Sequence, residues 1–252
     1  MKRLRWWVGG CVVLVAGVWG MIVQAAAPKL NRATYERLVA ADIAQVQACL
    51  SKCLESAAEA RRHQPTARAL AMLLAMEAEV LGDAALQQQA LQLAEALNKK
   101  DFAAADKLAK SLKASPSATP LASKPLHKQA GFHLEEVMSP YRLGRSGGLN
   151  IEKDIRDWSK KGAKLDPAAV EILAARTALL SEYTFHMPND KAEINKANTE
   201  QWQKYSQDLI ELSRQLAEEA AKGNSANPAT MTGLLNKINN KCSDCHNKFR
   251  DD

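Results

Sequence analysis

The stretch NKCSDCHNKFR, residues 240–250, decides how the rest of this sequence is interpreted. Within it, Cys242, Cys245 and His246 form the pattern C-x-x-C-H, which is typical of covalent haem c attachment. In that chemistry the two thiols add to the two haem vinyl groups as thioethers, and the adjacent histidine supplies the proximal nitrogen to the iron. The pattern therefore predicts one covalent haem c, bound through Cys242 and Cys245, with His246 as the iron ligand.

Two other kinds of site could use a C-x-x-C pair. A thioredoxin-type redox disulfide needs a βαβ setting, and the sequence has no such pattern. A zinc site needs a second pair of ligands at zinc spacing, for which the sequence offers no candidate. Haem attachment is therefore the interpretation that the pattern favours.

Residues 1–27 have the three-part pattern of a secretory signal. The basic residues Lys2, Arg3 and Arg5 precede an uncharged apolar stretch at 6–23, and small residues follow at 25–27. The apolar stretch is also just long enough to cross a bilayer. We therefore expect a signal peptide or an N-terminal membrane anchor, with the rest of the chain in the periplasm or otherwise exported, where haem c is attached.

The composition favours an all-α protein long enough for two domains. Of 252 residues, 46% are hydrophobic but only 5% are aromatic, whereas an all-β protein needs more aromatic and β-branched residues. The net charge of +6 includes three basic residues and no acid in residues 1–27, so the remainder carries +3. This charge gives no case for a nucleic-acid partner, which requires Lys and Arg clustered on one face.

Residues 29–113 are predicted to form a helical bundle that lacks a haem motif. Apolar residues at helical spacing mark a first helix, and Pro65 is expected to separate it from the second. Gly82 is expected to end that second helix. The Pro- and Ser-rich residues 114–131 are expected to be a linker or a loosely packed connection. The helices expected after Pro65 cover residues 66–81, 83–98 and 101–113.

Residues 132–252 are predicted to form a second four-helix bundle, in tandem with the first. The helix at 132–161 is expected to be interrupted by Ser139-Pro140 and by three glycines. An offset of 102 residues places Pro65 on Pro167, which suggests a duplicated bundle. The alternative is that two Ala- and Leu-rich segments resemble each other by composition alone. The remaining helices are expected over residues 166–185, 199–222 and 228–252.

The C-terminal half resembles the cytochrome c prime family over about residues 132–252. Members of that family look like four-helix bundles with C-x-x-C-H near the C-terminus, followed by an aromatic and a basic residue, here Phe249 and Arg250. The first half matches up to Lys113, where the motif is absent. The resemblance implies a haem-binding domain in the second half only, with Phe249 covering the haem edge. The residues that resemble the family's third helix and its following turn are Trp202, Leu209, Leu212, Leu216, Ala217, Ala220, Ala221 and Gly223.

The resemblance also implies that the residue across the haem from His246 comes from residues 133–138. Met138 is the nearest match, and core packing is its alternative role. His133 and the pair His186-Met187 are further ligand candidates, whereas His63 and His127 lie in the wrong half or the linker.

The family's propionate-contacting arginine has no equivalent in this sequence. Arg142 or Arg145 is expected to contact a propionate instead. Trp202 and Tyr205 are expected to pack on the haem or in the core.

Cys49 and Cys53 form a separate pair with C-x-x-x-C spacing, so they share one helix face. The simplest interpretation is two small core residues. The alternatives are a disulfide, which is strained at this spacing, or a metal or haem site.

The function that these features predict is an exported monohaem cytochrome that transfers electrons or binds a small gas such as NO or CO. No nucleophile–base pair or paired carboxylates are visible, so we expect no enzyme. The expected partners are an unidentified redox protein and, by resemblance, a second copy of the chain in a homodimer. The alternatives are a helical scaffold with a vestigial motif and a haem-based sensor.

Overall fold

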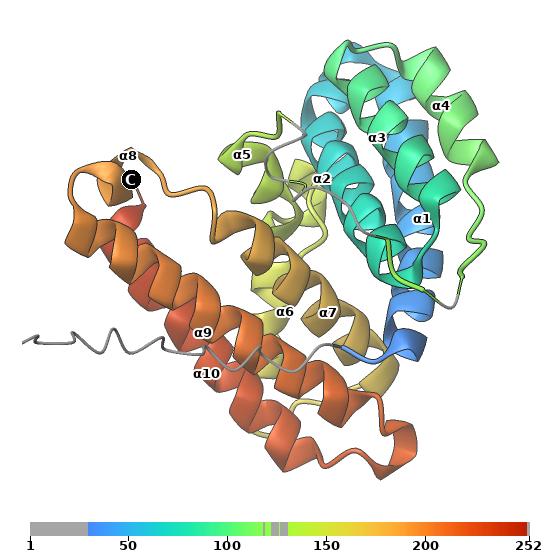
Figure 1. The fold of residues 1–252 in the computed structure, drawn as a ribbon. Helices are drawn as coiled ribbons and strands as arrows, with labels where there is room; N and C mark the ends of the chain where they lie inside the picture. The colour runs from blue at the N-terminus through green and yellow to red at the C-terminus, as the bar shows by residue number, and fades with distance from the viewer. Residues whose placement is uncertain (1–29, 118, 122–125, 127–130, 251–252) are drawn as a thin grey trace, which may run out of the picture.

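The computed structural model describes residues 30–117, 119–121, 126 and 131–250, which contain helices and no strand (Figure 1). The predicted all-α class is therefore confirmed. The predicted signal or anchor at 1–27 and His127 lie outside this part of the chain. No helix among the described residues is long and apolar enough to cross a membrane.

Seven long helices and six short elements make up the described fold. The long helices are α1 (Arg32–Glu55), α2 (Ala57–Leu81), α3 (Ala84–Asn98), α4 (Phe102–Ser111), α7 (Pro167–Thr184), α9 (Lys196–Ala220) and α10 (Pro228–Phe249). The short elements are α5 (Leu134–Val137), η2 (Ser139–Tyr141), η3 (Gly144–Ser146), α6 (Ile151–Trp158), α8 (Asp190–Glu193) and η4 (Gly223–Ser225).

Most helix ends follow from short polar side chains and from glycine. Asp166 and Asn227 each accept a backbone hydrogen bond and are followed by proline at the first helical position, as the sequence predicts. Gly82, with φ of +72°, ends α2 as predicted, because its left-handed conformation costs glycine little. Helix α9 starts at Lys196, three residues before the predicted Thr199, because Asn195 caps it.

The prediction that Pro65 separates two helices is wrong. The break falls at Ser56, whose extended backbone ends α1 and whose hydroxyl accepts a hydrogen bond from the Glu59 backbone N–H at 3.1 Å. Pro65 lies inside α2, where its ring removes one backbone hydrogen bond to the carbonyl of Arg61. Arg61 is exposed, so water can satisfy that carbonyl.

The helix predicted over 132–161 is interrupted at Ser139-Pro140 and around the glycines, as expected, but only short pieces form between the breaks. Pro140 lies in the 3-10 turn η2, and Gly147 adopts φ of +84° at the end of η3. A Cβ at Gly147 would lie 2.1 Å from the backbone oxygen of Arg62 in α2. This close approach needs glycine, so contact with α2 prevents one continuous helix.

The predicted linker at 114–131 is partly described, and its described residues pack against the end of α2. Ser115 donates its backbone N–H to the Asp83 carboxylate, and the N–H of Leu121 donates to the Glu79 carbonyl at 2.9 Å. Leu126 is buried. This part of the connection therefore runs along the first half of the protein.

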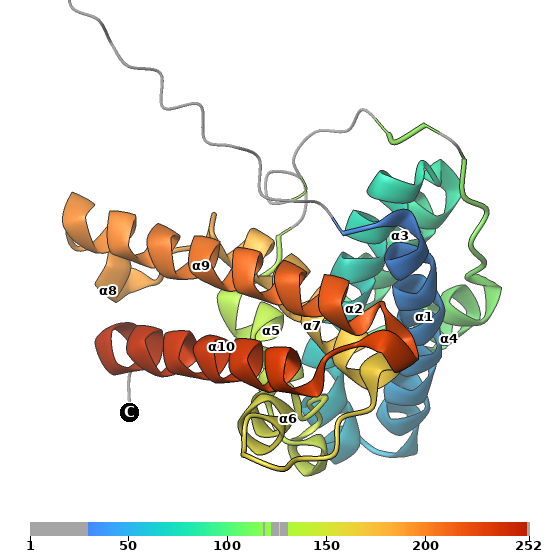
Figure 2. The same ribbon diagram turned by 90° about the horizontal axis from the view of Figure 1, so that it is seen from below.

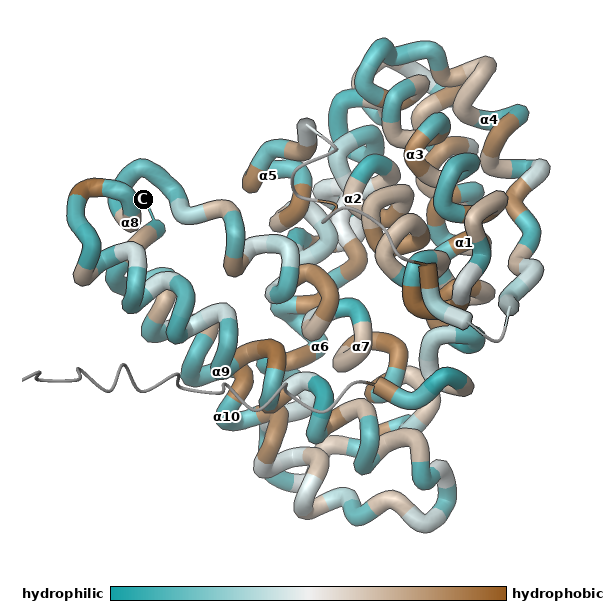
Figure 3. The backbone as a smooth tube through the Cα atoms, viewed as in Figure 1, coloured by the Kyte–Doolittle hydropathy of each residue, from teal (hydrophilic) through white to brown (hydrophobic). Residues whose placement is uncertain are grey.

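Helix α7 lies between two groups of helices. On one side it packs against α1 and α2, and on the other it packs against α9, which in turn packs against α10 (Figures 1 and 2). Twelve of its eighteen residues are buried, so its solvent-exposed face is narrower than that of an ordinary surface helix. Helix α9, in contrast, is mostly hydrophilic, with its strongly hydrophobic residues in the C-terminal half (Figure 3).

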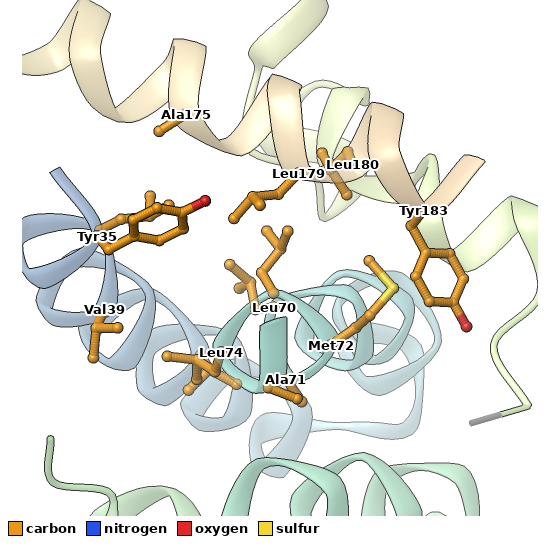
Figure 4. Packing of buried hydrophobic residues seen from close by; sticks show 14 of the residues in the cluster. Tyr35, Val39, Leu70, Ala71, Met72, Leu74, Ala175, Leu179, Leu180 and Tyr183 are labelled. Atoms are coloured by element: carbon orange, nitrogen blue, oxygen red, sulfur yellow. The ribbon is translucent and has the colours of Figure 1, made fainter. Parts of the chain in front are cut away.

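One apolar core continues across both groups of helices. Leu179 of α7 and Leu70 of α2 point toward each other, with Tyr35 of α1 beside them (Figure 4). The same cluster reaches Leu93 in α3 and Ile238 in α10. The two halves of the chain therefore do not have separate cores.

Buried charged groups join α7 to α1. Glu171 accepts hydrogen bonds from the Thr34 hydroxyl at 2.6 Å and from Arg37 Nη2 at 2.5 Å. Arg176 donates from Nε to Asp42 Oδ1 at 2.6 Å, and Asp42 is completely buried. Pairing offsets the cost of taking these charges out of water.

Glu77 of α2 lies against the Asp42–Arg176 pair and is also completely buried. Burial, followed by the nearby charge of Asp42, raises the pKa of Glu77 well above its usual range. Glu77 is therefore a neutral acid beside Asp42, and Asp42 carries the negative charge that faces Arg176.

Cys49 and Cys53 are buried on α1 with free thiols. Burial raises the pKa of each thiol to about 11, so both are neutral near pH 7. Their environment fits the interpretation of small core residues, and the described structure contains no disulfide between them.

We predict that Glu77→Gln stabilises the protein in a pH-dependent way. Above about pH 4 the unfolded chain releases the Glu77 proton whereas the folded chain retains it, so wild-type stability falls as pH rises toward the raised pKa. Glutamine keeps a hydrogen-bond donor without this proton. Urea unfolding should give Glu77→Gln and wild type the same free energy of unfolding at pH 4. Above pH 4 the variant should gain about 1.4 kcal/mol relative to wild type for each pH unit, up to the raised pKa of Glu77.

The control for this experiment is Glu200→Gln at an exposed position of α9, which should keep the wild-type pH dependence. A Glu77→Gln effect of equal size at pH 4 and pH 8 would contradict a neutral Glu77.

Candidate cofactor site

Cys242, Cys245, His246 and Phe249 lie on one face of α10, because positions i, i+3, i+4 and i+7 of an α-helix point the same way. All four side chains are buried or half-buried, whereas the positions between them in the sequence are exposed. The spacing C-x-x-C-H therefore also fixes which way the three reactive side chains face.

This face of α10 forms one wall of a cavity of about 540 Å³. The other walls come from α5, η2, α6, α7 and α9, so the cavity is lined by segments that are far apart in the sequence. Its volume lies within the range of about 300–1,000 Å³ that is usual for small-molecule and cofactor sites. Its larger lining side chains are Leu134, Met138, Tyr141, Trp202, Leu209 and Phe249.

Met138 lines the same cavity as the C-x-x-C-H residues, from the turn between α5 and η2. Arg142 also lines the cavity and is exposed, and Arg250 lies at the end of α10 beside it. Arg145 is not among the lining residues. Of the two arginines that the sequence offers for a propionate, the structure therefore brings only Arg142 to the site.

The remaining ligand candidates lie elsewhere in the described structure. His133 and His186 are exposed, and neither lines the cavity. Met187 packs against the main apolar core, and His63 lies on α2 with its Nε2 3.3 Å from Glu59.

Aromatic side chains hold the C-terminal end of α10 in place. Phe249 is only 1% exposed, and its ring packs edge-to-face with Trp202 at 5.6 Å and with Tyr205 at 6.3 Å between centroids. Trp202 donates from Nε1 to the Thr184 carbonyl at 2.8 Å, and the Asn189 amide donates to the Phe249 carbonyl at 2.7 Å. These contacts connect α10 to α9 and to Asn189 at the end that carries the motif, and they connect α9 to α7.

The cavity keeps the motif side chains uncharged near neutral pH. Burial raises the pKa of Cys242 to about 12 and that of Cys245 to about 11. Burial, and next the charge of Arg250, lowers the pKa of His246. A neutral imidazole has a free nitrogen lone pair, which is what a metal ligand needs.

The polar residues of the cavity could not be recognised from the sequence. Burial raises the pKa of Tyr141, and hydrogen bonds with Ser181 and Thr177 of α7 partly offset this rise. Ser181, Thr184 and Ser206 line the site from α7 and α9. A single serine in an Ala- and Leu-rich helix gives no local signal, so only the packing of the helices identifies these residues.

No family model matches the chain, and no curated protein or solved structure matches it either. Within the described residues, no group of three or more His, Cys, Asp or Glu side chains could hold a bare metal ion.

We predict that Phe249→Ala destabilises the protein by about 3 kcal/mol, because it empties a fully buried aromatic site. Chemical denaturation measures this loss, and amide exchange should accelerate most in the last turns of α10. Phe185→Ala is the control, since this half-buried ring should cost much less. Equal losses for the two variants would contradict a special role of Phe249 in fixing α10.

Proposed function

We propose that the protein is an exported monohaem c-type cytochrome whose haem occupies the cavity beside α10. One observation carries this proposal: the two thiols and the imidazole of C-x-x-C-H face a common cavity of cofactor size. A C-x-x-C-H pattern that occurred by chance would have no reason to face such a cavity.

The donor set of the cavity fits haem c. Cys242 and Cys245 would hold the two vinyl groups, and His246, in its neutral form, would bind the iron. Such an iron supplies one-electron transfer or the binding of a small gas, depending on what occupies its sixth position. Arg142 and Arg250 are the cations of the lining that could pair with haem carboxylates.

Met138 is the lining residue that we propose would bind or cover the haem iron. It lines the cavity from the segment between α5 and η2, whereas every described histidine other than His246 lies outside the lining. A thioether at this position can bind the iron or cover it.

The helices around the cavity support a cytochrome c prime-like haem bundle in the second half. Helices α6, α7, α9 and α10 contribute to the lining, and α7–α9, α9–α10 and α10–α6 are neighbours. The helices α1–α4 would then be the haem-free member of a tandem pair. The pattern of residues 1–27 supports export, by a cleaved signal or by an anchor.

Purified exported protein should retain one haem after acid–acetone extraction and give the pyridine haemochrome spectrum of haem c. Replacing both thiols, Cys242→Ala with Cys245→Ala, should abolish the retained haem. Replacing the core pair, Cys49→Ala with Cys53→Ala, is the matched control and should not. Wild-type protein without covalent haem would end the proposal and leave a helical scaffold as the alternative.

The Met138→Ala variant should bind CO to its ferrous haem about tenfold faster than wild type or more, which corresponds to a barrier lower by about 1.4 kcal/mol. Stopped-flow absorption measures this rate. Met187→Ala is the control, because Met187 packs in the core outside the cavity. Equal CO kinetics in wild type and Met138→Ala would show that Met138 neither binds nor covers the iron.

A further inference from the structure

The wall of the cavity formed by residues 134–142 has little regular structure of its own. It consists of the four-residue helix α5 and the three-residue turn η2. Isolated turns of this length are unstable, because a single helical turn forms too few hydrogen bonds to fix its backbone. The position of Met138 and Tyr141 therefore depends on what this segment packs against.

Arg68 of α2 holds the beginning of this wall. It is only 4% exposed, and its guanidinium forms an ion pair with Glu136 of α5. The same group donates from Nη2 to the Gly131 carbonyl at 3.3 Å and stands 5.0 Å over the Phe132 ring. The buried Arg68 guanidinium thus contacts Gly131, Phe132 and Glu136, which lead into or begin the wall.

Thr66 and Arg62, also of α2, contact the residues that follow Glu136 in the chain. The Thr66 hydroxyl donates to Ser139 Oγ at 3.1 Å, and Ser139 donates to the Glu136 carbonyl at 2.6 Å. Both hydroxyl-bearing residues are buried. Further on, Gly147 lies directly against the Arg62 backbone. Helix α2 therefore contacts the segment from Gly131 to Gly147 at repeated points.

The residues that contact α2 alternate with those that line the cavity. Glu136 and Ser139 bind α2, whereas Glu135, Met138 and Tyr141 line the cavity. The segment 134–142 therefore contacts α2 with one side and lines the cavity with the other.

We propose that α2 of the haem-free half, through Arg68 and Thr66, sets the position of the cavity wall that carries Met138 and Tyr141. Arg68 and Thr66 are positioning residues, because neither lines the cavity. The inference rests on the proposed function only for its effect on a haem, since the wall is held in the same way without one.

Amide hydrogen exchange on the Cys242→Ala, Cys245→Ala protein tests the positioning without any haem. The reporters are the amides of Met138, Tyr141 and Arg142, which donate to carbonyls within the wall. Arg68→Met should speed their exchange at least about tenfold, which corresponds to about 1.4 kcal/mol of local stability. Arg68→Lys should restore part of the protection.

The control variant is Arg37→Met, which breaks another ion pair between the halves, to Glu171 of α7, and has no contact with the wall. It should leave the three reporter amides unchanged. Equal acceleration by Arg37→Met and Arg68→Met, or unchanged exchange in a folded Arg68→Met, would overturn the proposal. If Arg68→Met does not fold, the same exchange measurement on Thr66→Val decides. This variant removes the hydrogen bond to Ser139 at nearly constant volume, and it should speed exchange of the three reporter amides.

In the haem-loaded protein, Arg68→Met should shift the ferrous absorption spectrum and the CO binding rate in the direction of Met138→Ala. Arg37→Met should not change either quantity. If wild-type protein holds no haem, the proposed function fails, but the exchange experiment still decides whether α2 positions the wall. If haem is present and only the exchange result is negative, the positioning proposal alone fails.

Discussion

The burial of α7 on nearly all sides is the constraint on which the structure depends. Its charged residues are Glu171, which is buried, and Arg176 and Glu182, which are partly buried. Each has an ion-pair partner on a neighbouring helix: Arg37 and Asp42 of α1 pair with Glu171 and Arg176, and Arg214 of α9 pairs with Glu182. A buried charge without its partner costs several kcal/mol. Helix α7 is therefore stable in this position only when helices from both halves surround it. Because α7 also supplies Ser181 and Thr184 to the cavity, the site depends on α1 as well as on α9.

Much of the fold could be predicted where the signal is local. The pairs Asp166-Pro167 and Asn227-Pro228 mark helix starts through their own chemistry, and Gly82 marks a helix end. Pro65 does not mark the helix start, because Ser56-x-x-Glu59 is a capping sequence that starts α2 before it. The broken segment after residue 132 could not be predicted in detail, since its shape depends on contacts with α2, which is distant in the sequence.

The residues of the site, too, could be predicted only where the signal is local. The spacing of Cys242, Cys245 and His246 places them on one helix face from sequence alone, and Met138 is brought to the same cavity. The serines and Tyr141 could not be predicted, because the walls come from helices whose mutual packing no short pattern encodes. His133 and Arg145 were plausible by position in the sequence, but their side chains are exposed and outside the lining.

The apolar core that runs from Leu93 in α3 to Ile238 in α10 has a thermodynamic consequence. Any group that binds the folded chain and not the unfolded chain raises the free energy of unfolding by linkage. When one cooperative unit includes both halves, that gain is distributed over helices that never touch the bound group. Occupancy of the cavity would then slow the opening of α3 and α4 as well, so the half without a ligand would share in its binding energy.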